Sequence, residues 1–291
     1  MVLLLNNENV IKFTEWCYVQ KNLKANTIKS YLSSIASAHK MNNLDPTACT
    51  NYISMQMIKG IENLEFYKKI CKKTRKVMTL PLLKIAGHEL SKTDWSADSK
   101  QVIWTVLTSA FFGSFRLGEI LCPNEKNFNS FKNLLWEDLT FRNDGSILIK
   151  IKVPKSRQPQ GEFIDIFPFK GHNCCPAAAL RKLKNLRADP EFLKKPVFMF
   201  KNGVFVTPSL INKILPKLLE NTMGKAAQEY LGHSLRPALA SAMANDPLTA
   251  RDQELKKWGR WNSSNYLLYT RLKLNQKKYL FSLISNVLNK Q

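Results

Sequence analysis

Four short segments hold the side chains best suited to bind or attack a phosphate. In the first, FRLGE, Arg116 lies within an apolar stretch, where a guanidinium is costly to bury without a partner. Glu119 follows three residues later and can supply that partner on the same face of a helix. The spacing is typical of a structural ion pair. It also suits a guanidinium fork that a carboxylate orients towards phosphate.

The second segment is Lys155-Ser156-Arg157, at the tip of a predicted β-hairpin. A lysine at such a tip could act as the general acid that protonates a leaving oxygen. The tip could equally do no more than contact phosphate or solvent. Lys150 and Lys152, on the preceding strand, are lower-ranked alternatives to Lys155.

The third segment, LGHSLR, contains His233 and Arg236. Their spacing of three places them on one face if a helix starts here, and an imidazole beside a guanidinium suits a phosphate in its transition state. A capping or core histidine would look the same. Pro237 comes next, and because proline is tolerated in a first helical turn, Arg236 is predicted near a helix start.

The fourth segment, GRWNSSNYLLYTR, follows Trp258 and is rich in aromatic and basic side chains. By itself it is typical of an aromatic core helix with a basic rim. Its two tyrosines are Tyr266 and Tyr269.

The overall charge points to a polyanionic partner. The chain of 291 residues has 44 lysines and arginines against 22 acidic residues, a formal net charge of +22. Such a surplus opposes compaction, and it favours nucleic acid, since neutralising phosphates releases counterions. An anionic membrane surface is a weaker alternative, and charge that serves only solubility is another.

Several classes of protein are disfavoured. No apolar run approaches the ~18 residues of a membrane span, and the apolar N-terminal stretch lacks the features of a signal peptide. Six scattered cysteines are too few for a disulfide framework, so reduced intracellular thiols are expected. Adjacent Cys174 and Cys175, even with His172 nearby, lack zinc-site spacing, so neither a metal nor another cofactor is expected.

The chain is predicted to fold as two domains, mainly α with a small antiparallel β-sheet. Residues 9 to about 70 show helical periodicity and are assigned to an N-terminal domain, 1–73. A basic linker, 74–79, closes the run of positive charge from Lys68 to Lys76, which could also lie along a phosphate backbone. Residues 80–291 form the second domain.

Within the second domain, a helix is predicted from about Leu80 and a longer one over 102–112, after a cap at 94–96. Ile147, Ile149 and Ile151 alternate with other residues as in a strand, a turn follows at 154–161, and a second strand returns over 163–167. From Pro176 onwards the pattern is helical.

Taken together, the order Arg, Lys, His-x-x-Arg, Trp, Tyr resembles the catalytic set of the tyrosine recombinase (phage-integrase-type) family. FFGSFRLGEIL, CPAAAL, HSLR and GRWNSSNYLLYTR carry the resemblance, which is closest to the Crypton and DIRS-like mobile-element branch. It covers residues 75–275 well and the N-terminal region only in outline, as a helical core-binding domain.

The resemblance implies a set of functional residues. Those matching the catalytic positions are Arg116, Lys155, His233, Arg236, Trp261 and Tyr269, with Glu119 in the supporting acidic position. Those expected to contact DNA are Lys72, Lys73, Arg75, Lys76, Arg157, Arg260 and Arg271. The step from Trp261 to Tyr269 is shorter than in many bacterial and phage members. It resembles the Crypton-like branch, and it selects Tyr269 over Tyr266.

The implied reaction is metal- and ATP-independent breaking and rejoining of DNA strands through a 3′-phosphotyrosyl intermediate. The implied partners are double-stranded DNA and the protein itself, as a tetramer on DNA. The implied location is intracellular, at DNA: the nucleus if the host is eukaryotic, and otherwise the cytoplasm. The amphipathic tail 276–291 would dock on a neighbouring protomer or pack in cis. Two alternatives remain: a type IB topoisomerase-like enzyme that relaxes DNA, and a catalytically inactive DNA-binding structural protein of this fold.

Overall fold

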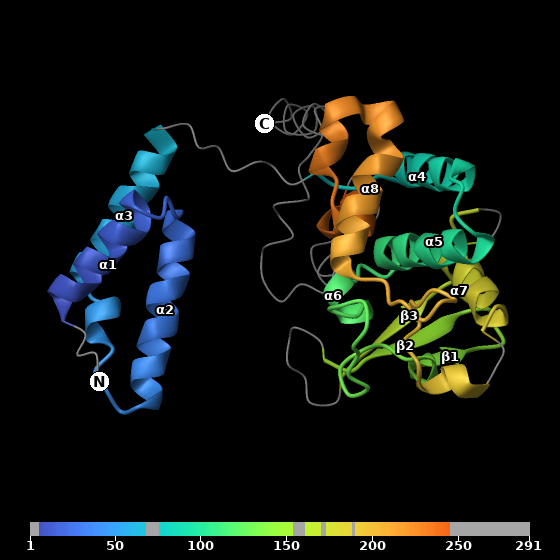
Figure 1. Ribbon diagram of the computed structural model, residues 1–291, viewed down its shortest axis with the longest axis horizontal. Helices are drawn as coiled ribbons and strands as arrows, with labels where there is room; N and C mark the ends of the chain where they lie inside the picture. Colours follow the sequence, from blue (N-terminus) through green and yellow to red (C-terminus); the bar gives the residue numbers. More distant parts are fainter. Residues whose placement is uncertain (1–5, 68–75, 154–160, 170–172, 188–189, 245–291) are drawn as a thin grey trace, which may run out of the picture. The chain divides into compact units, whose positions relative to one another are not determined.

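The chain divides into two compact units, residues 1–74 and 75–291. The computed structural model describes residues 6–67, 76–153, 161–169, 173–187 and 190–244 (Figure 1). The first unit is helical throughout its described part, and its elements are α1 (Asn7–Val19), α2 (Ala25–Met41), the 3₁₀ turn η1 (Thr47–Cys49) and α3 (Tyr52–Tyr67).

Apolar side chains at helical spacing hold the first unit together. Ile28 and Leu32 of α2 are buried with Ile58 of α3 in one small core. The start of α2 is held by α3, since the backbone N–H of Ala25 donates to the Glu65 carboxylate over 2.7 Å. A carboxylate at a helix N-terminus meets the unpaired N–H groups and the positive end of the helix dipole.

The second unit combines helices with a small sheet. Its helices are α4 (Leu80–Lys92), α5 (Ala97–Phe112), α6 (Leu117–Ile120), α7 (Pro176–Asn185), α8 (Pro208–Met223) and α9 (Ala238–Ala244). Its strands are β1 (Leu139–Phe141), β2 (Ile147–Ile151) and β3 (Glu162–Ile166). Its 3₁₀ turns are η2 (Trp136–Asp138), η3 (Pro190–Lys194), η4 (Gly224–Glu229) and η5 (Gly232–Ser234).

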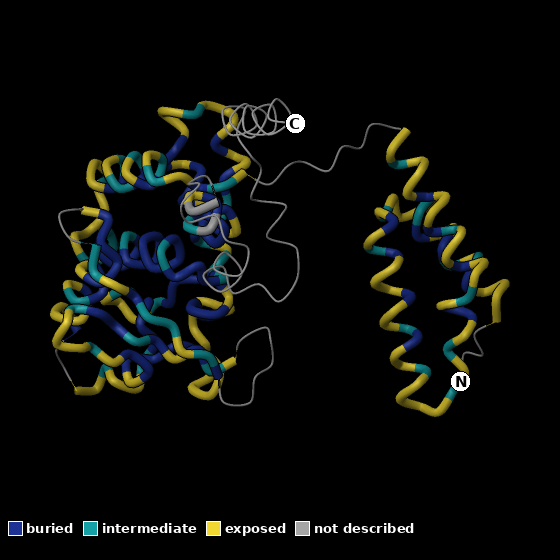
Figure 2. The backbone as a smooth tube through the Cα atoms, turned by 180° about the vertical axis from the view of Figure 1, so that it is seen from behind, coloured by how far each residue is buried: buried dark blue, intermediate teal, exposed yellow. Residues whose placement is uncertain are grey.

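Helix α5 is the central element of the second unit. It runs between α4 and the sheet in Figure 1, and its tube is dark blue over most of its length in Figure 2. Nearly every side chain from Gln101 to Phe111 is buried. The Ser96 hydroxyl accepts the backbone N–H of Ser99, so the predicted cap is present and the helix begins earlier than expected.

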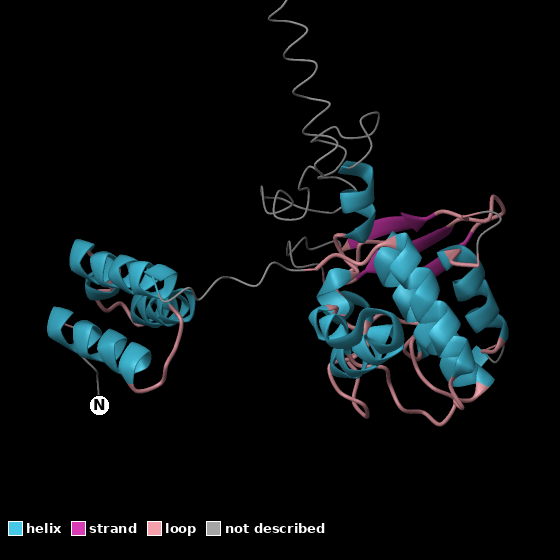
Figure 3. Ribbon diagram, turned by 90° about the horizontal axis from the view of Figure 1, so that it is seen from above, coloured by secondary structure: helices cyan, strands magenta, loops and turns pink. Residues whose placement is uncertain are grey.

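The sheet, drawn in magenta in Figure 3, is antiparallel and has the strand order β1-β2-β3. Ile147, Ile149 and Ile151 are buried while the residues between them are more exposed, as the alternation predicts. Ile149 pairs with Ile164 on the returning strand β3. The short edge strand β1 was not expected, because a strand of this length carries too little periodic signal. The architecture is therefore mainly α with a small antiparallel sheet, as predicted.

The expectation of helix from Pro176 to the end is wrong between α7 and α8. There the chain forms two isolated β-bridges, Leu135 with Pro196 and Met199 with Phe205. Gly203 has φ +84°, a conformation that favours glycine, and it allows the tight turn that reverses the chain before Phe205.

Residues 76–79, expected in a linker, belong to the second unit where they are described. Met78 is fully buried in its core, and its backbone N–H donates to the carbonyl of Ser234 over 2.9 Å. The Thr79 hydroxyl caps α4. The segment around Ser234, which contains the predicted site residues His233 and Arg236, is therefore tied to the start of this unit.

Three further findings concern only the described residues. Among them, no helix is long and apolar enough to cross a membrane. Within the same ranges, no group of three or more His, Cys, Asp or Glu side chains is placed to hold a metal ion. The cysteines described there are buried free thiols: Cys17, Cys49, Cys122, Cys174 and Cys175.

Candidate functional site

A tight turn between α5 and α6 sets the position of Arg116. A Cβ on Gly113 would lie 2.2 Å from a ring carbon of Phe115, so only glycine lets this fully buried ring fold back over the turn. Ser114 is also fully buried and has φ +49°, an unusual conformation for a residue with a side chain. The turn places Arg116 at the N-cap position, directly before the first residue of α6.

Glu119 closes α6 back onto Arg116. Its carboxylate accepts the backbone N–H of Arg116 over 2.9 Å and the guanidinium Nη1 over 2.7 Å. This is the reaching-back geometry of a capping box, with the arginine in the cap position and not within the helix as the sequence suggested. The Glu119 side chain is 5% exposed and that of Arg116 is 37% exposed. The carboxylate is buried, whereas its partner remains open to solvent.

A second arginine approaches the same carboxylate. Nη1 of Arg236 lies 3.8 Å from Oε2 of Glu119, and the Arg236 side chain is 10% exposed. Glu119 thus lies between two guanidinium groups from segments far apart in the sequence. Its pairing with Arg116 was predicted from local spacing, but its approach to Arg236 was not.

Gly232 brings the His233 segment against α6. A Cβ on Gly232 would lie 2.1 Å from a methyl carbon of Leu117, so the backbone there approaches α6 as closely as glycine allows. Its N–H donates to the side chain of Asn212 on α8 over 2.8 Å. Asn212 was missed, because a lone exposed asparagine in a helix carries no sequence signal for such a role.

His233 is exposed and lies in the 3₁₀ turn η5. Arg236 follows in a turn, and α9 begins at Ala238, after Pro237. His233 and Arg236 therefore do not share the face of a continuous helix. Proline ends the turn and opens the helix instead, as its fixed φ favours at a first helical turn.

The strand lysines proposed as alternatives to Lys155 have partners of their own. Lys152 donates to the Asp138 carboxylate, 2.7 Å away, and to the carbonyl of Ser130 over 2.8 Å, and its side chain is 16% exposed. The ammonium of Lys150 lies 5.9 Å from the centre of the Phe163 ring. Lys152 in particular is held in a structural contact, which weakens its case as a proton donor.

Several predicted site residues lie outside the described ranges. These are Lys72, Lys73, Arg75, Lys155, Arg157, Arg260, Trp261, Tyr266, Tyr269 and Arg271, together with the tail 276–291. Lys76 is described, and its ammonium lies 3.4 Å from Glu229 in an exposed ion pair. Such pairs contribute little to stability.

Arg116, Glu119 and Arg236 form one cluster, called here the Arg116 cluster. The solvent-exposed side of Arg116 defines what this cluster can bind. Among the described residues, Glu119 is the one hydrogen-bond acceptor of the Arg116 guanidinium, and the guanidinium donates to it through Nη1. The remaining N–H groups can form the two-pronged contact that guanidinium makes with phosphate oxygens. With one carboxylate between two arginines, the cluster keeps a net positive charge, which suits an anion.

Comparison with known proteins identifies the fold. No protein-family model matches the sequence, and no curated protein matches it. Among solved structures, the XerH site-specific recombinase bound to palindromic difH substrate is similar, with a TM-score of 0.59 and 17% identity over 97% of this chain and 72% of that chain. The Tn1549 transposon integrase in complex with circular intermediate DNA gives a TM-score of 0.56 and 11% identity, covering 95% of this chain and 85% of that chain.

The fold is that of the tyrosine recombinases. At these sequence identities, the likeness concerns the fold alone. The narrower resemblance to the Crypton and DIRS-like branch stays a prediction.

Proposed function

We propose that this protein is a DNA recombinase that breaks and rejoins strands through Tyr269. The observation that supports this most directly is the buried Glu119 carboxylate between Arg116 and Arg236, in a fold shared with recombinases. A carboxylate that holds two arginines, one of them 37% exposed, is arranged to present positive charge to an anion. The net charge of +22 makes DNA the natural anion.

In the proposed reaction, the hydroxyl oxygen of Tyr269 attacks a backbone phosphorus atom. The bond from phosphorus to the 5′-oxygen breaks, and a 3′-phosphotyrosyl bond replaces it. The displaced 5′-oxygen takes a proton from Lys155. Attack by a 5′-hydroxyl on the phosphotyrosyl bond later reverses these steps and frees the tyrosine. One phosphodiester bond is exchanged for another, so the reaction needs no ATP.

The other predicted catalytic residues have distinct parts in this proposal. Arg116 and Arg236 donate to the non-bridging oxygens, on which negative charge builds in the transition state. His233 receives the phenol proton or orients the phosphate, which is needed because a phenol with pKa near 10 is a weak nucleophile at neutral pH. Trp261 contributes only a hydrogen bond or packing, since its indole nitrogen cannot accept a proton.

The partner proposals rest on the same fold. The similar XerH and Tn1549 structures are complexes with DNA. We propose double-stranded DNA as the substrate here, with Lys76 and the basic residues outside the described ranges along its backbone. A tetramer on two duplexes, joined by exchange of the tail 276–291, is proposed for the recombining state. Deletion after Lys273 should abolish synapsis, and normal synapsis by the truncated protein would contradict tail exchange.

Covalent trapping tests the proposed chemistry. Nicked duplexes, cut both from the DNA flanking the gene and from a randomised pool, release the 5′-hydroxyl fragment and prevent religation. With EDTA present and no ATP, the wild-type protein should form a denaturant-resistant adduct on the 3′-phosphate side. Tyr269→Phe should form none.

Tyr266→Phe is the matched control, because it removes the same hydroxyl three residues away. It should retain the adduct. If the wild type forms no adduct and Tyr269→Phe behaves identically, the catalytic proposal is wrong and a DNA-binding role remains. An adduct formed equally by both would instead assign the nucleophile to another residue. Relaxation of supercoiled plasmid without strand exchange between two sites would instead indicate the topoisomerase-like alternative.

A further inference from the structure

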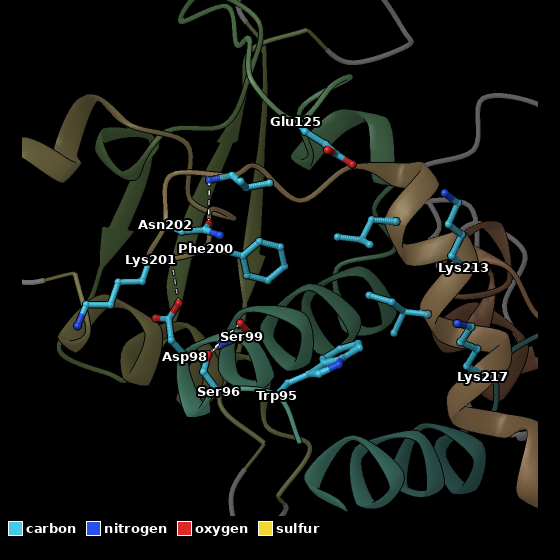
Figure 4. A pocket seen from close by; sticks show the side chains of 13 residues that line it. Trp95, Ser96, Asp98, Ser99, Glu125, Phe200, Lys201, Asn202, Lys213 and Lys217 are labelled. Carbon is cyan, nitrogen blue, oxygen red and sulfur yellow. Dashed lines mark hydrogen bonds between the residues drawn. The ribbon is translucent and has the colours of Figure 1, made fainter. Parts of the chain in front are cut away.

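A groove runs along one face of α8. A cavity of about 670 Å³ lies between α8, the start of α5 and the loop at 200–204 (Figure 4). A second cavity of about 420 Å³ continues it towards the end of α8, and the two share Trp95, Ile214 and Lys217. They therefore form one elongated depression, and it includes none of the Arg116 cluster.

The groove is apolar inside. In Figure 4 the rings of Trp95 and Phe200 project into the cavity from elements facing α8. Leu210 and Ile214 of α8 line the same space, and the Trp95 side chain remains 40% exposed. A large aromatic left exposed in a concave apolar site is typical of a surface that a partner covers.

The shape fits a helix. The residues of α8 that line the groove include Leu210, Ile214, Lys217 and Asn221, which recur on one helical face. From the first to the last they span about 16 Å, the length of roughly three helical turns. An amphipathic helix of that length can place side chains at positions i, i+4 and i+7 against the groove.

The lysines at the edge of the groove indicate the charge of the segment that it would bind. Lys213 and Lys217 project from α8, both exposed, and within the described ranges neither has an ion-pair partner. Lys201 lies on the opposite side (Figure 4). Of the acidic residues in this first cavity, Asp98 is bound to Arg187, which leaves Glu125 at one end.

The tail of this chain is a poor match for that rim. Residues 276–291 contain three lysines and no acidic residue, so basic charge would face basic charge. Juxtaposed like charges suppress binding, whereas a negative segment is both steered and held.

We propose that this groove binds an acidic amphipathic helix from a partner protein. Its apolar side chains would fill the space between Trp95, Phe200 and Ile214, and its carboxylates would lie against Lys213 and Lys217. The proposal goes beyond DNA cleavage and does not depend on it, because none of these residues belongs to the Arg116 cluster.

Selection of peptides on the full-length protein tests the groove. A phage-displayed library of random 16-residue peptides is enriched on the wild type, and the dissociation constants of the recovered peptides are measured by fluorescence anisotropy. The expected peptides carry apolar residues at i, i+4 and i+7 with acidic residues between them. Scrambled versions of the same composition should bind at least about tenfold more weakly, a difference of about 1.4 kcal/mol.

Two double variants separate the groove from general attraction to a basic protein. Lys213→Glu/Lys217→Glu should weaken the peptides about tenfold or more. The matched control Lys132→Glu/Lys225→Glu reverses two exposed lysines outside the groove and should leave binding unchanged. Trp95→Ala should weaken binding without reversing any charge.

Other outcomes overturn the proposal. Equal weakening by both double variants, basic consensus peptides, or no enrichment would each exclude an acidic helix. Displacement of the peptides by a synthetic 276–291 peptide would assign the groove to a second copy of this chain. If duplex DNA displaces the peptides from the wild type, and this displacement is absent from the Lys213→Glu/Lys217→Glu variant, the groove is assigned to DNA.

Discussion

Two arginine–carboxylate pairs in the second unit differ in how far the protein itself occupies the hydrogen-bonding groups of the arginine. Arg187 is 3% exposed at its side chain, and its two terminal nitrogens meet both oxygens of Asp98 at 2.6 and 3.0 Å. It also donates to the carbonyl of Met199, and Asp98 accepts the backbone N–H of Lys201. Both terminal nitrogens of Arg187 and both oxygens of Asp98 are therefore engaged by the protein.

The Arg116–Glu119 pair is arranged differently. Glu119 engages one nitrogen of Arg116 and approaches Arg236, while the Arg116 side chain stays 37% exposed. A saturated pair stabilises the fold, whereas a shared carboxylate holds a guanidinium in place without using up its donors. The comparison separates a structural arginine from one available to a ligand, and the same conservative substitution at each should reveal the difference.

Arg116→Lys should produce the largest effect, on chemistry. Lysine keeps the charge and the link to Glu119 but loses the planar fork. Adduct formation on the nicked duplex should fall about 100-fold or more, the typical cost of removing one donor from a developing oxyanion. The unfolding free energy, measured by urea denaturation, should change by less than about 1 kcal/mol because the pair is partly exposed. A large loss of stability with normal cleavage would make Arg116 structural.

Arg187→Lys should show the opposite pattern. A buried ammonium cannot satisfy both Asp98 oxygens and the Met199 carbonyl at once, so we expect the unfolding free energy to fall by about 2–3 kcal/mol. Adduct formation per folded molecule should be unchanged below the melting temperature. Loss of cleavage in a fully folded variant would remove the distinction between the two pairs.

Gly232→Ala tests the contact between α6 and the His233 segment, the two described segments that contain predicted catalytic residues. The new methyl group would sit 2.1 Å from the Leu117 side chain, so the His233 segment must shift away from α6. We expect a loss of about 1–3 kcal/mol in stability, as for overpacking, with a parallel fall in cleavage.

Gly118→Ala is the matched control, because nothing lies within 4 Å of a Cβ at that position. It should be neutral or slightly stabilising. Combining Gly232→Ala with Leu117→Ala opens space for the methyl group and should restore part of the cleavage. Unchanged cleavage in Gly232→Ala alone would show that the contact does not position the site.

The smallest expected effect concerns the Arg187–Asp98 pair and its contribution to the unfolding free energy at acidic pH. Burial raises the pKa of Asp98, but the hydrogen bonds and charges of Arg187 and Lys201 together outweigh it, so the pKa lies below its usual value of 3.8. A depressed carboxyl pKa stabilises the folded state above the unfolded value, and this contribution is lost as the pH falls through the lower folded value. Between pH 5 and about 3, the unfolding free energy of the wild type should therefore fall more steeply than that of Asp98→Asn. Parallel slopes in urea titrations would contradict this assignment.

Local features were predictable because they depend on near neighbours along the chain. The alternation of Ile147, Ile149 and Ile151 specifies a strand with one buried face, and Ser96 specifies the start of α5. The spacing of three between Arg116 and Glu119 specifies their contact, although not that Arg116 would precede the helix.

Contacts between distant segments could not be predicted in this way. The approach of Arg236 to Glu119, the close packing of Gly232 on Leu117 and the capture of Lys152 by Asp138 each depend on how elements pack in three dimensions. The groove along α8 depends on two loops that reach it from elsewhere in the chain.

The sequence by itself determined the types of the catalytic candidates, the strong positive charge and the local elements, because composition and periodicity are properties of the chain. The roles of Lys155, Trp261 and Tyr269 rest on family resemblance and stay predictions. Only the tertiary structure decided that one carboxylate lies between two arginines and that Arg116 stays open while Arg187 is closed. Burial and the sharing of hydrogen-bond acceptors are set by packing, which no spacing along the chain encodes.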